Sequence, residues 1–410
     1  MGGRTTRTGG IAVNAAHRPG PLDGVTVVTL EHAIAAPYCT RQLADLGARV
    51  IKVERPGVGD FARAYDQRTR GLASHFVWVN RSKESLTLDL KQTQAQDILG
   101  ELLADADVLV QNLAPGAAQR MGLCFEALHA RFPRLIVCDI SGYGEGGTMR
   151  DRKAYDLLIQ SEAGFLSITG TPETPSKAGI SIADIAAGMF AYSGILSALL
   201  QRGRTGEGSH VEVSMLEALT EWMGFPMYYA YDGQEPPGRH GAAHATIYPY
   251  GPFPTGDGRV VMLGLQNERE WALFCERVLQ QPALTRDVRF ASNAGRNAHR
   301  DILRGLIVEA FAALDAEEVL RRLDLASIAN SSVNSAGDLW THPQLHGRGR
   351  FRTITSSAGA LQALLPPASS SAFDARMDPV PALGEHTEAI LRGLQRSDGE
   401  IAALRAQGTV

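Results

Sequence analysis

Strand-like and helix-like patterns alternate along the first half of the chain. Residues 24–30 (GVTVVTL) form an apolar run typical of a buried strand, residues 39–48 (CTRQLADLGA) have helical spacing, and residues 49–56 (RVIKVERP) form a second strand. A strand, a helix and a strand joined by short links indicate a parallel sheet flanked by helices. The same patterns predict strands at 85–90, 107–112 and 135–141, helices at 93–106 and 124–132, and a strand followed by a helix at 208–223. We therefore expect an α/β fold built on a parallel sheet.

The longest uncharged segment, Ile185–Leu200, directly follows a single carboxylate, Asp184, in the stretch SIADIAAG. The segment is slightly short for a membrane span, contains several glycines and serines, and is followed by the polar stretch QRGRTGEG. These features favour a buried helix of a soluble protein. A helix that starts right after Asp184 could use this residue as its N-cap, or as a reactive carboxylate kept ionised by the helix dipole. The local sequence leaves both interpretations open.

The sequence pattern changes past the middle of the chain. Residues 231–253 (YDGQEPPGRHGAAHATIYPYGPF) are rich in Gly, Pro, His and Tyr, as in a linker or a site loop. Residues 258–265 and 268–279 then open a smaller α+β region, residues 356–374 are typical of a loop, and residues 384–394 predict a closing helix. We expect four parts: a flexible N-terminal tail at 1–20, a large domain at 21–224, a linker and small domain at 225–345, and a linker with a return to the large domain at 346–410.

Composition restricts the class of protein. The chain has 410 residues, of which 44% are hydrophobic and 20% are charged, and a net charge of −4, as in a soluble globular protein of two or more domains. This charge offers no basic surface for nucleic acid or an anionic membrane, and we expect neither as a partner. Four cysteines without a CxxC pair indicate reduced thiols in a cytoplasmic protein. The N-terminal stretch lacks the apolar run of a secretory signal, and its match to a myristoylation pattern (Gly2, Thr6) is loose.

Several common site motifs fit the sequence poorly. The turn after the first strand reads LEHAIAAPYC without GxGxxG, which disfavours a nicotinamide-dependent dehydrogenase even though Glu54 could hold a ribose. Small residues such as Ala33 could still admit another ligand near the start of a helix. His240 and His244 have a metal-ligand spacing, but Gly241 indicates a loop and no HExxH motif is present, so we expect no metal site.

Six segments, in order along the chain, carry a family resemblance. They are residues 21–63, NRSKESLTLDLK (80–91), VLVQNLAPGAAQRMGL (108–123), ISGYGEGG (140–147), TGEGSHVEVSMLEAL (205–219) and LGEHTEAIL (383–391). Together they resemble the class III CoA-transferases, a family that includes formyl-CoA, carnitine and dicarboxylate CoA-transferases and the α-methylacyl-CoA racemases. The resemblance implies a Rossmann-like large domain with a parallel sheet and a smaller α+β domain, joined by long linkers. It also implies a homodimer in which two ring-shaped chains interlock.

By this resemblance, Asp184 is the catalytic residue of an enzyme that moves CoA from an acyl-CoA, expected to be succinyl-CoA, to a free carboxylic acid. The Asp184 carboxylate would attack the thioester, which leads to an aspartyl–acyl anhydride and to enzyme-bound CoA intermediates. CoA is then a substrate, and we expect no tightly bound cofactor. Matching of the motifs assigns the CoA contacts to Ala33, Arg55, Leu88, Lys91, Asn112, Arg120, Lys153 and Tyr155.

The segment RHGAAHATIYPY (239–250) resembles the branch of the family that uses succinyl-CoA and small dicarboxylic acids such as glutarate, itaconate, mesaconate or citramalate. A dicarboxylate brings a second charge that the site must neutralise. The candidate contacts for the acid are Arg239, His240, His244 and Tyr248. Arg239 is the strongest of these, because a guanidinium can grip a carboxylate with two N–H groups. A linker that simply faces water is the alternative for this segment.

Two other functions stay open. A racemase or epimerase of the same family would carry a histidine in a His-Asp-hydrophobic-Asn stretch, where this chain reads Tyr155-Asp156-Leu157-Leu158, which counts against it. A non-catalytic acyl-CoA-binding protein would keep the basic CoA contacts without needing Asp184. The presence of both features favours the enzyme.

Overall fold

The computed structural model describes residues 18–410, which divide into two compact units. The first unit holds the residues up to 153 together with 184–215 and 351–410, and the second unit holds 154–183 and 216–350. The tail predicted at 1–20, with the Gly2–Thr6 pattern, lies almost entirely outside the described residues. The predicted domain boundaries stay predictions.

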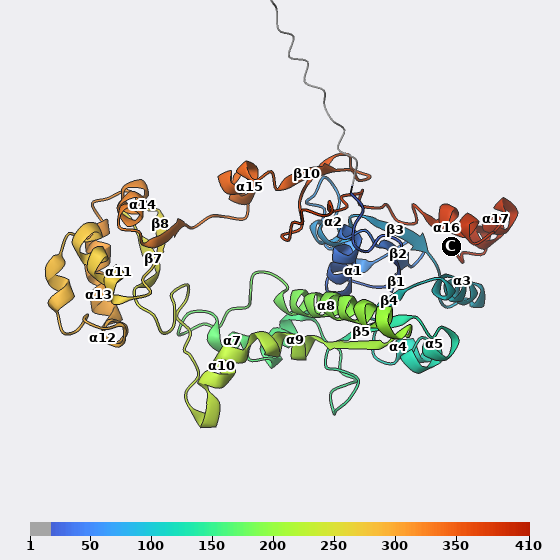
Figure 1. Ribbon diagram of the computed structural model, residues 1–410, viewed down its shortest axis with the longest axis horizontal. Coiled ribbons are helices and arrows are strands. Elements are labelled where there is room, and N and C mark those ends of the chain that lie inside the picture. The colour runs from blue at the N-terminus through green and yellow to red at the C-terminus, as the bar shows by residue number, and fades with distance from the viewer. Residues whose placement is uncertain (1–17) are drawn as a thin grey trace, which may run out of the picture. The chain divides into compact units, whose positions relative to one another are not determined.

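Six parallel strands form the sheet of the first unit, in the order β3-β2-β1-β4-β5-β6 (Figure 1). The strands are β1 (Thr26–Leu30), β2 (Arg49–Glu54), β3 (Lys83–Thr87), β4 (Val108–Gln111), β5 (Ile136–Ser141) and β6 (His210–Ser214). The central strands read as near-continuous apolar runs because both faces of the sheet are covered. Every strand predicted in this half of the chain overlaps an observed strand, although the one predicted at 85–90 is found at Lys83–Thr87. The strand order is that of a Rossmann-like sheet.

Helices pack on both faces of this sheet. One face carries α3 (Thr93–Ala104), α5 (Phe125–Arg131), α16 (Thr387–Gly393) and α17 (Asp398–Ala406), whose apolar side chains share one core with the strands. The other face carries α1 (Ala35–Asp45), which begins earlier than predicted because Pro37 is tolerated in its first turn. The shorter helices of this unit are α2 (Ser74–Asn80), α4 (Ala117–Arg120) and a 3₁₀ turn at Phe61–Ala64.

The apolar segment after Asp184 belongs to one long helix, α8 (Ile182–Thr205). The helix begins before Asp184, so the expectation that it starts right after this residue is wrong. Of the two interpretations left open for Asp184, the N-cap is excluded, because the residue lies inside the helix. The physical reason is that another carboxylate serves the helix start, since Asp156 Oδ1 accepts a hydrogen bond from the backbone N–H of Ala183 at 2.8 Å. Asp184 therefore lies in the first turn of the helix and is not used as its N-cap.

Gly188 lets α8 come into direct contact with α1. A Cβ atom at this position would lie 2.6 Å from the carbonyl oxygen of Ala35, which is closer than atoms can approach. Within the described residues, α8 is the helix whose length and apolar composition would be compatible with a membrane span. In its most apolar stretch of 18 residues, 39% is buried inside the protein. The helix is thus less buried within a single chain than the sequence pattern predicted.

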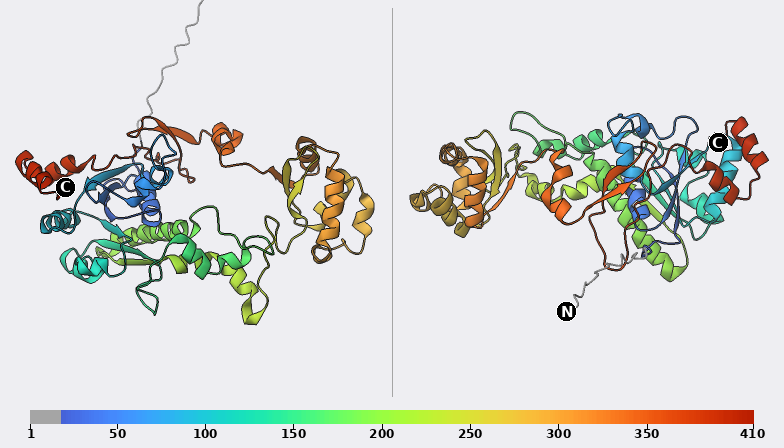
Figure 2. Two further views of the ribbon diagram at one scale, coloured as in Figure 1. Left: turned by 180° about the vertical axis from the view of Figure 1, so that it is seen from behind. Right: turned by 90° about the horizontal axis from the view of Figure 1, so that it is seen from above.

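The C-terminal segment completes the first unit. The strands β10 (Phe351–Ile354) and β11 (Leu361–Leu364) form an antiparallel hairpin, so the prediction of a loop over 356–374 is wrong at the second strand. This pair was missed because only Ile354 and Leu361 point into a small core, while most of their neighbours are exposed. The predicted closing helix is confirmed as α16, which lies beside β3 (Figure 1). Figure 2 shows the C-terminal helices in red, next to the C-terminus of the chain.

Three antiparallel strands and a group of helices form the core of the second unit, which confirms the smaller α+β region. The strands β7 (Tyr250–Pro254), β8 (Val260–Gly264) and β9 (Ala329–Ser332) pair in that order. Against them pack α13 (Arg300–Phe311), α14 (Ala316–Leu325) and α11 (Glu268–Leu273), which continues as a π-helical turn at Phe274–Val278. The other elements are α6 (Asp156–Glu162), α7 (Phe165–Ile168), α9 (Met215–Trp222), α10 (Gly224–Tyr229), α12 (Asn293–Ala298), α15 (Pro343–Gly347) and 3₁₀ turns at Tyr231–Gly233, Pro282–Arg286 and Asp338–Thr341.

Candidate active site

The ligand-binding edge of a parallel α/β sheet lies at the carboxyl ends of its strands, near the point where the strand order reverses. In this sheet the reversal falls between β1 and β4. The predicted CoA residues Ala33, Arg55, Leu88 and Asn112 follow the ends of β1, β2, β3 and β4, respectively. Four predicted contacts from separate parts of the sequence therefore lie along one edge of the sheet.

Asn112 and Asp60 hold the turn that follows β1. The Asn112 side chain accepts a hydrogen bond from the backbone N–H of His32 and donates one to the carbonyl oxygen of the same residue, both at 2.9 Å. Ala33 has a left-handed backbone conformation (φ 62°), and its N–H donates to Asp60 Oδ1 at 3.2 Å. A residue other than glycine keeps this conformation only when its surroundings support it. The turn at the strand reversal is therefore fixed by the protein itself.

Four of the predicted CoA contacts are exposed cations, namely Arg55, Lys91, Arg120 and Lys153. Over residues 18–410 none of these four forms a salt bridge with a carboxylate. Exposed cations without a carboxylate partner suit the phosphate groups of a ligand such as CoA. Leu88 is different, because its side chain is 2% exposed and belongs to the core of the sheet, so only its backbone could meet a ligand.

Helix α8 places Asp184 beside the start of α1. Gly188 lies one turn further along α8, on the same face as Asp184, and this glycine is in contact with Ala35 at the start of α1. Because α1 follows the Ala33 turn directly, Asp184 lies on the face of α8 that meets the first turn of α1. Asp184 is partly exposed, and the helix dipole interacts favourably with a negative charge in the first turn of a helix. Its small buried neighbours are Ala183, Ala186 and Ala187.

A buried charge network, which the sequence analysis did not find, lies under the turn after β1. We call it the Glu31 network, and it consists of Glu31, Lys52, Asp60 and Lys83, whose side chains are fully buried. Lys52 Nζ lies 2.8 Å from Asp60 Oδ2 and 3.2 Å from Glu31 Oε1, and Lys83 Nζ lies 2.6 Å from the same Glu31 oxygen. Burial alone would raise the pKa of Glu31, but the two lysines lower it to about 2. Because Asp60 also binds the Ala33 N–H, the network supports the predicted CoA turn.

Three of the four predicted acceptor residues come together in the second unit, around Arg300, a residue that the sequence analysis did not select. Arg300 Nη1 lies 2.8 Å from His240 Nδ1, and Nη2 donates to the carbonyl oxygen of His244 at 3.2 Å. The guanidinium carbon lies 5.2 Å from the centre of the Tyr248 ring, within cation–π distance. No local sequence signal could mark this arginine, since it is separated from His240 by 60 residues.

Arg239 and Tyr155 have other surroundings in the second unit. The Arg239 guanidinium donates to the carbonyl oxygens of Thr171 at 2.9 Å and Pro172 at 2.8 Å, and more weakly to that of Ser167 at 3.5 Å. These bonds tie the loop that contains Arg239 to the turn at 167–172. Tyr155 directly precedes α6 and is 68% exposed.

Two further features of the first unit involve none of the predicted site residues. Asp139, Glu145 and His210 bring possible metal-ligand atoms within 4.8 Å of one another, but His210 Nε2 is hydrogen-bonded to Asp139 Oδ2 at 2.7 Å, and this bond raises the pKa of His210. The hydrogen bond accounts for the cluster without a metal ion.

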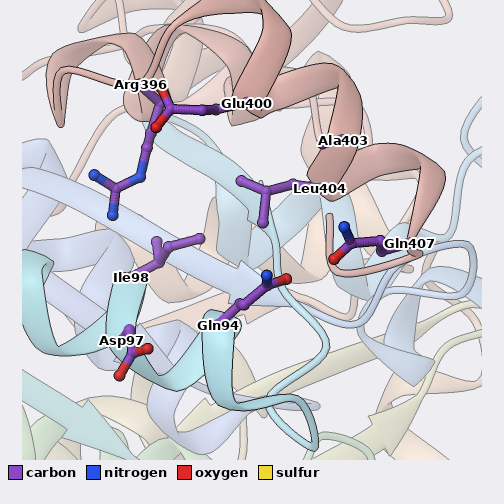
Figure 3. Close-up of a pocket in the computed structure, with 8 residues that line it drawn as sticks. All are labelled: Gln94, Asp97, Ile98, Arg396, Glu400, Ala403, Leu404 and Gln407. Atoms are coloured by element: carbon purple, nitrogen blue, oxygen red, sulfur yellow. The ribbon is translucent and has the colours of Figure 1, made fainter.

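A pocket between α3 and α17 is shown in Figure 3. It is lined by Gln94, Asp97, Ile98, Arg396, Glu400, Ala403, Leu404 and Gln407.

Comparison with known proteins identifies the family. Residues 22–387 match the sequence model of CoA-transferase family III. The chain is 34% identical over 395 residues to a succinyl-CoA:glutarate CoA-transferase of Mus musculus, which covers 95% of this chain and 90% of that protein. It is 34% identical over 340 residues to a succinyl-CoA:mesaconate CoA-transferase of Haloarcula hispanica, with 80% and 84% covered.

A solved structure agrees with these relatives. The crystal structure of a CAIB/BAIF family protein from Brucella suis superposes with a TM-score of 0.83 at 32% identity, over 92% of this chain and 100% of that one. The sequence match and the structural match both extend over nearly the whole chain. The chain therefore belongs to CoA-transferase family III, as its motifs predicted.

Proposed function

We propose that this enzyme transfers CoA from succinyl-CoA to a small dicarboxylic acid such as glutarate, mesaconate, itaconate or citramalate. The names of the mouse and Haloarcula relatives, which pair succinyl-CoA with a dicarboxylic acid, support the substrate class. The observation that carries the reaction type is the carboxylate of Asp184 in the first turn of α8, on the face that meets α1. A carboxylate suits this reaction, because its anhydride is reactive enough to return an acyl group to a thiol.

The proposed steps conserve every atom of the two substrates. An Asp184 oxygen attacks the thioester carbon of succinyl-CoA, the C–S bond breaks, and CoA leaves as the thiolate while a mixed anhydride forms. The thiolate then attacks the aspartyl carbonyl, which releases succinate and leaves CoA bound to Asp184 as a thioester. The carboxylate of the second acid displaces this CoA to form a new anhydride, and the thiolate attacks the new acyl carbonyl. The products are the new CoA thioester and a free Asp184 carboxylate, and no net proton is consumed.

We propose that the CoA substrate binds along the carboxyl edge of the sheet. Its phosphates would meet Arg55, Lys91, Arg120 and Lys153, which are exposed and lack carboxylate partners within the described chain. The turn at Ala33, whose backbone is held in place by Asn112, would contact the part of CoA beyond its phosphates. Tyr155 is proposed to contact the substrate near the thioester.

A panel of acids tests this function. Purified enzyme is incubated with succinyl-CoA and one acid at a time, and new CoA thioesters are detected by mass spectrometry. Glutarate, mesaconate, itaconate, citramalate and oxalate form the dicarboxylate set, and butyrate serves as the monocarboxylate control. We expect new thioesters with at least one dicarboxylate, and a kcat/KM for butyrate that is lower by about tenfold or more, since burying the second charge requires a dedicated partner.

The same panel separates the alternatives. Formation of no new thioester with any acid would contradict the transferase. Exchange of the α-proton of a 2-methylacyl-CoA for deuterium in D₂O would instead indicate a racemase. Binding of acyl-CoA with neither reaction would indicate a binding protein.

We further propose that two chains form a homodimer with interlocked rings. Within each unit, large apolar side chains are left uncovered by the single chain. On α8 of the first unit Leu200 is 73% exposed, and in the second unit Trp222, Phe225 and Tyr228 are 47%, 60% and 80% exposed. A second copy of the chain is the partner that would cover such surfaces in a homodimer.

Interlocking predicts a dimer that does not dissociate on dilution. Separation of two interlocked chains requires part of a chain to unfold, so we expect only dimer in sedimentation velocity runs down to nanomolar protein and in about 1 M salt. A folded monomer in rapid exchange with dimer at these concentrations would contradict interlocking.

A further inference from the structure

Arg300 is a half-buried cation whose partners in the protein are all neutral. It is the first residue of α13, and besides His240 Nδ1 its guanidinium binds the carbonyl oxygen of His244 at 3.2 Å and Asn297 Oδ1 at 2.5 Å. The ring of Tyr248 lies against the same guanidinium. In the part of the chain that the structure describes, no carboxylate lies within salt-bridge distance of Arg300. Its positive charge is therefore not paired with a carboxylate, although Asp301 lies in the same turn of α13 and its charge acts on Tyr248.

Arg296, which lies nearby in the sequence, shows how the same unit treats an arginine with a structural role. Arg296 is 2% exposed, and its Nη1 and Nη2 atoms lie 2.6 and 3.1 Å from the two carboxylate oxygens of Glu268. A guanidinium that is removed from water is normally compensated in this way, because an unpaired buried charge is costly. The contrast indicates that the charge of Arg300 is available to an anion from outside the chain.

The groups around Arg300 suit a carboxylate. Burial and the Arg300 charge both lower the pKa of His240, which favours the neutral form of its ring. Because Nδ1 accepts from Arg300, the proton of that neutral ring is on Nε2, where it can serve as a donor. The Tyr248 hydroxyl is buried and makes no hydrogen bond of normal geometry to the described residues, and Arg304 also faces this tyrosine.

We propose that Arg300, with His240 and Tyr248, binds the second carboxylate of the dicarboxylic substrate. The identity of the substrate in this proposal rests on the proposed function. The position of the subsite rests on the geometry of the second unit. The carboxylate would bind to the guanidinium through charge-assisted N–H···O bonds, with the His240 and Tyr248 donors beside it. Arg239 ties its loop to the carbonyl oxygens of residues 167–172. Arg300 differs from it by the His240 ring at its Nη1 atom and the Tyr248 ring against its guanidinium.

Substitution of Arg300 by methionine tests the proposal. We expect the Arg300→Met enzyme to lose about 10- to 100-fold in kcat/KM for glutarate, mostly through KM, and to change little for butyrate, so that the preference for dicarboxylates falls by the same factor. The kcat/KM of Arg300→Lys for glutarate should lie between those of the wild type and Arg300→Met, because lysine keeps the charge but lacks the planar guanidinium group. Arg269→Met, which removes an exposed charge elsewhere in the second unit, is the matched control and should keep the wild-type preference.

A binding measurement separates this proposal from the transferase proposal. Glutarate should raise the melting temperature of the wild type and of Arg269→Met, whereas butyrate should not, and glutarate should lose its effect on Arg300→Met. If the wild type transfers CoA to no acid but shows this pattern, the transferase proposal is wrong while the carboxylate subsite is supported. If the wild type transfers CoA to dicarboxylates and Arg300→Met keeps the same preference, the subsite is wrong while the function stands. A preference lost only in Arg239→Met would overturn the role of Arg300.

Discussion

Replacement of Asp184 by alanine is expected to lower the rate of CoA transfer by at least about a thousandfold while acyl-CoA still binds. In the proposed reaction every covalent step passes through this carboxylate, and an alanine side chain offers no oxygen to attack the thioester. The fold should survive the change, because alanine is a good helix former and the lost contact with the helix dipole costs only about 0.3–1 kcal/mol. The measurements are the transfer rate and the affinity for a non-reacting acyl-CoA analogue.

A matched control separates chemistry from stability. Glu126 is an exposed carboxylate in the first turn of α5, so Glu126→Ala removes the same charge from the same kind of position and should keep full activity. In the wild type, donor acyl-CoA followed by hydroxylamine or borohydride should modify the peptide that contains Asp184. Transfer by Asp184→Ala within about tenfold of the wild type would refute the covalent mechanism.

Replacement of Lys52 by methionine is expected to lower the free energy of unfolding by about 3–5 kcal/mol. The Lys52 ammonium group is fully buried between Glu31 and Asp60. Its removal leaves the negative charges of these two buried carboxylates only partly neutralised. Arg49 lies on the same strand and forms a salt bridge to Glu84, but its side chain is 50% exposed. Arg49→Met should therefore cost less than about 1 kcal/mol. Equal losses in the two variants, measured by urea denaturation, would contradict the buried network.

The dependence of stability on pH gives the Lys52 variant a second readout. The pKa of Glu31 is about 2 in the folded protein and 4.5 as its ordinary value, so the stability that Glu31 contributes is complete above pH 4.5 and is lost as the pH falls toward 2. Loss of Lys52 removes one of the two charges that lower this pKa. The difference in stability between wild type and Lys52→Met should therefore shrink over this range of pH.

Much of the first unit could be predicted because its signals are local. Strands such as 24–30 and 49–56 are short apolar runs with turn residues at their ends, and a strand buried on both faces has no alternative to such a run. The start of α8 could not be predicted in the same way. The carboxylate that binds the N–H of Ala183 at its start belongs to Asp156, 27 residues away, so only the folded chain brings the two together.

The chemistry of the site shows the same division. Asp184 and the four exposed cations were found because they stand in motifs of a family. Lys52 and Lys83 are ordinary charged residues in the sequence, and their burial follows from the pairing of β2 with β3, which no single stretch of the chain encodes. Arg300 likewise depends on the return of α13 to the loop that contains His240.

The path of the chain through the first unit has a consequence for its synthesis. The edge strand β3 is covered by α16, where the Thr87 N–H donates to Thr387 Oγ1 across a separation of 300 residues, and Ile390 and Leu391 complete the core beneath it. On the ribosome, the strands of the Rossmann-like sheet therefore emerge long before the segment that closes their core. The apolar edge of the nascent sheet therefore stays uncovered while the whole second unit is translated. Chaperones can bind this edge during that time. Co-expression of chaperones should thus raise the yield of active enzyme more than it would for a protein whose domains are continuous in sequence.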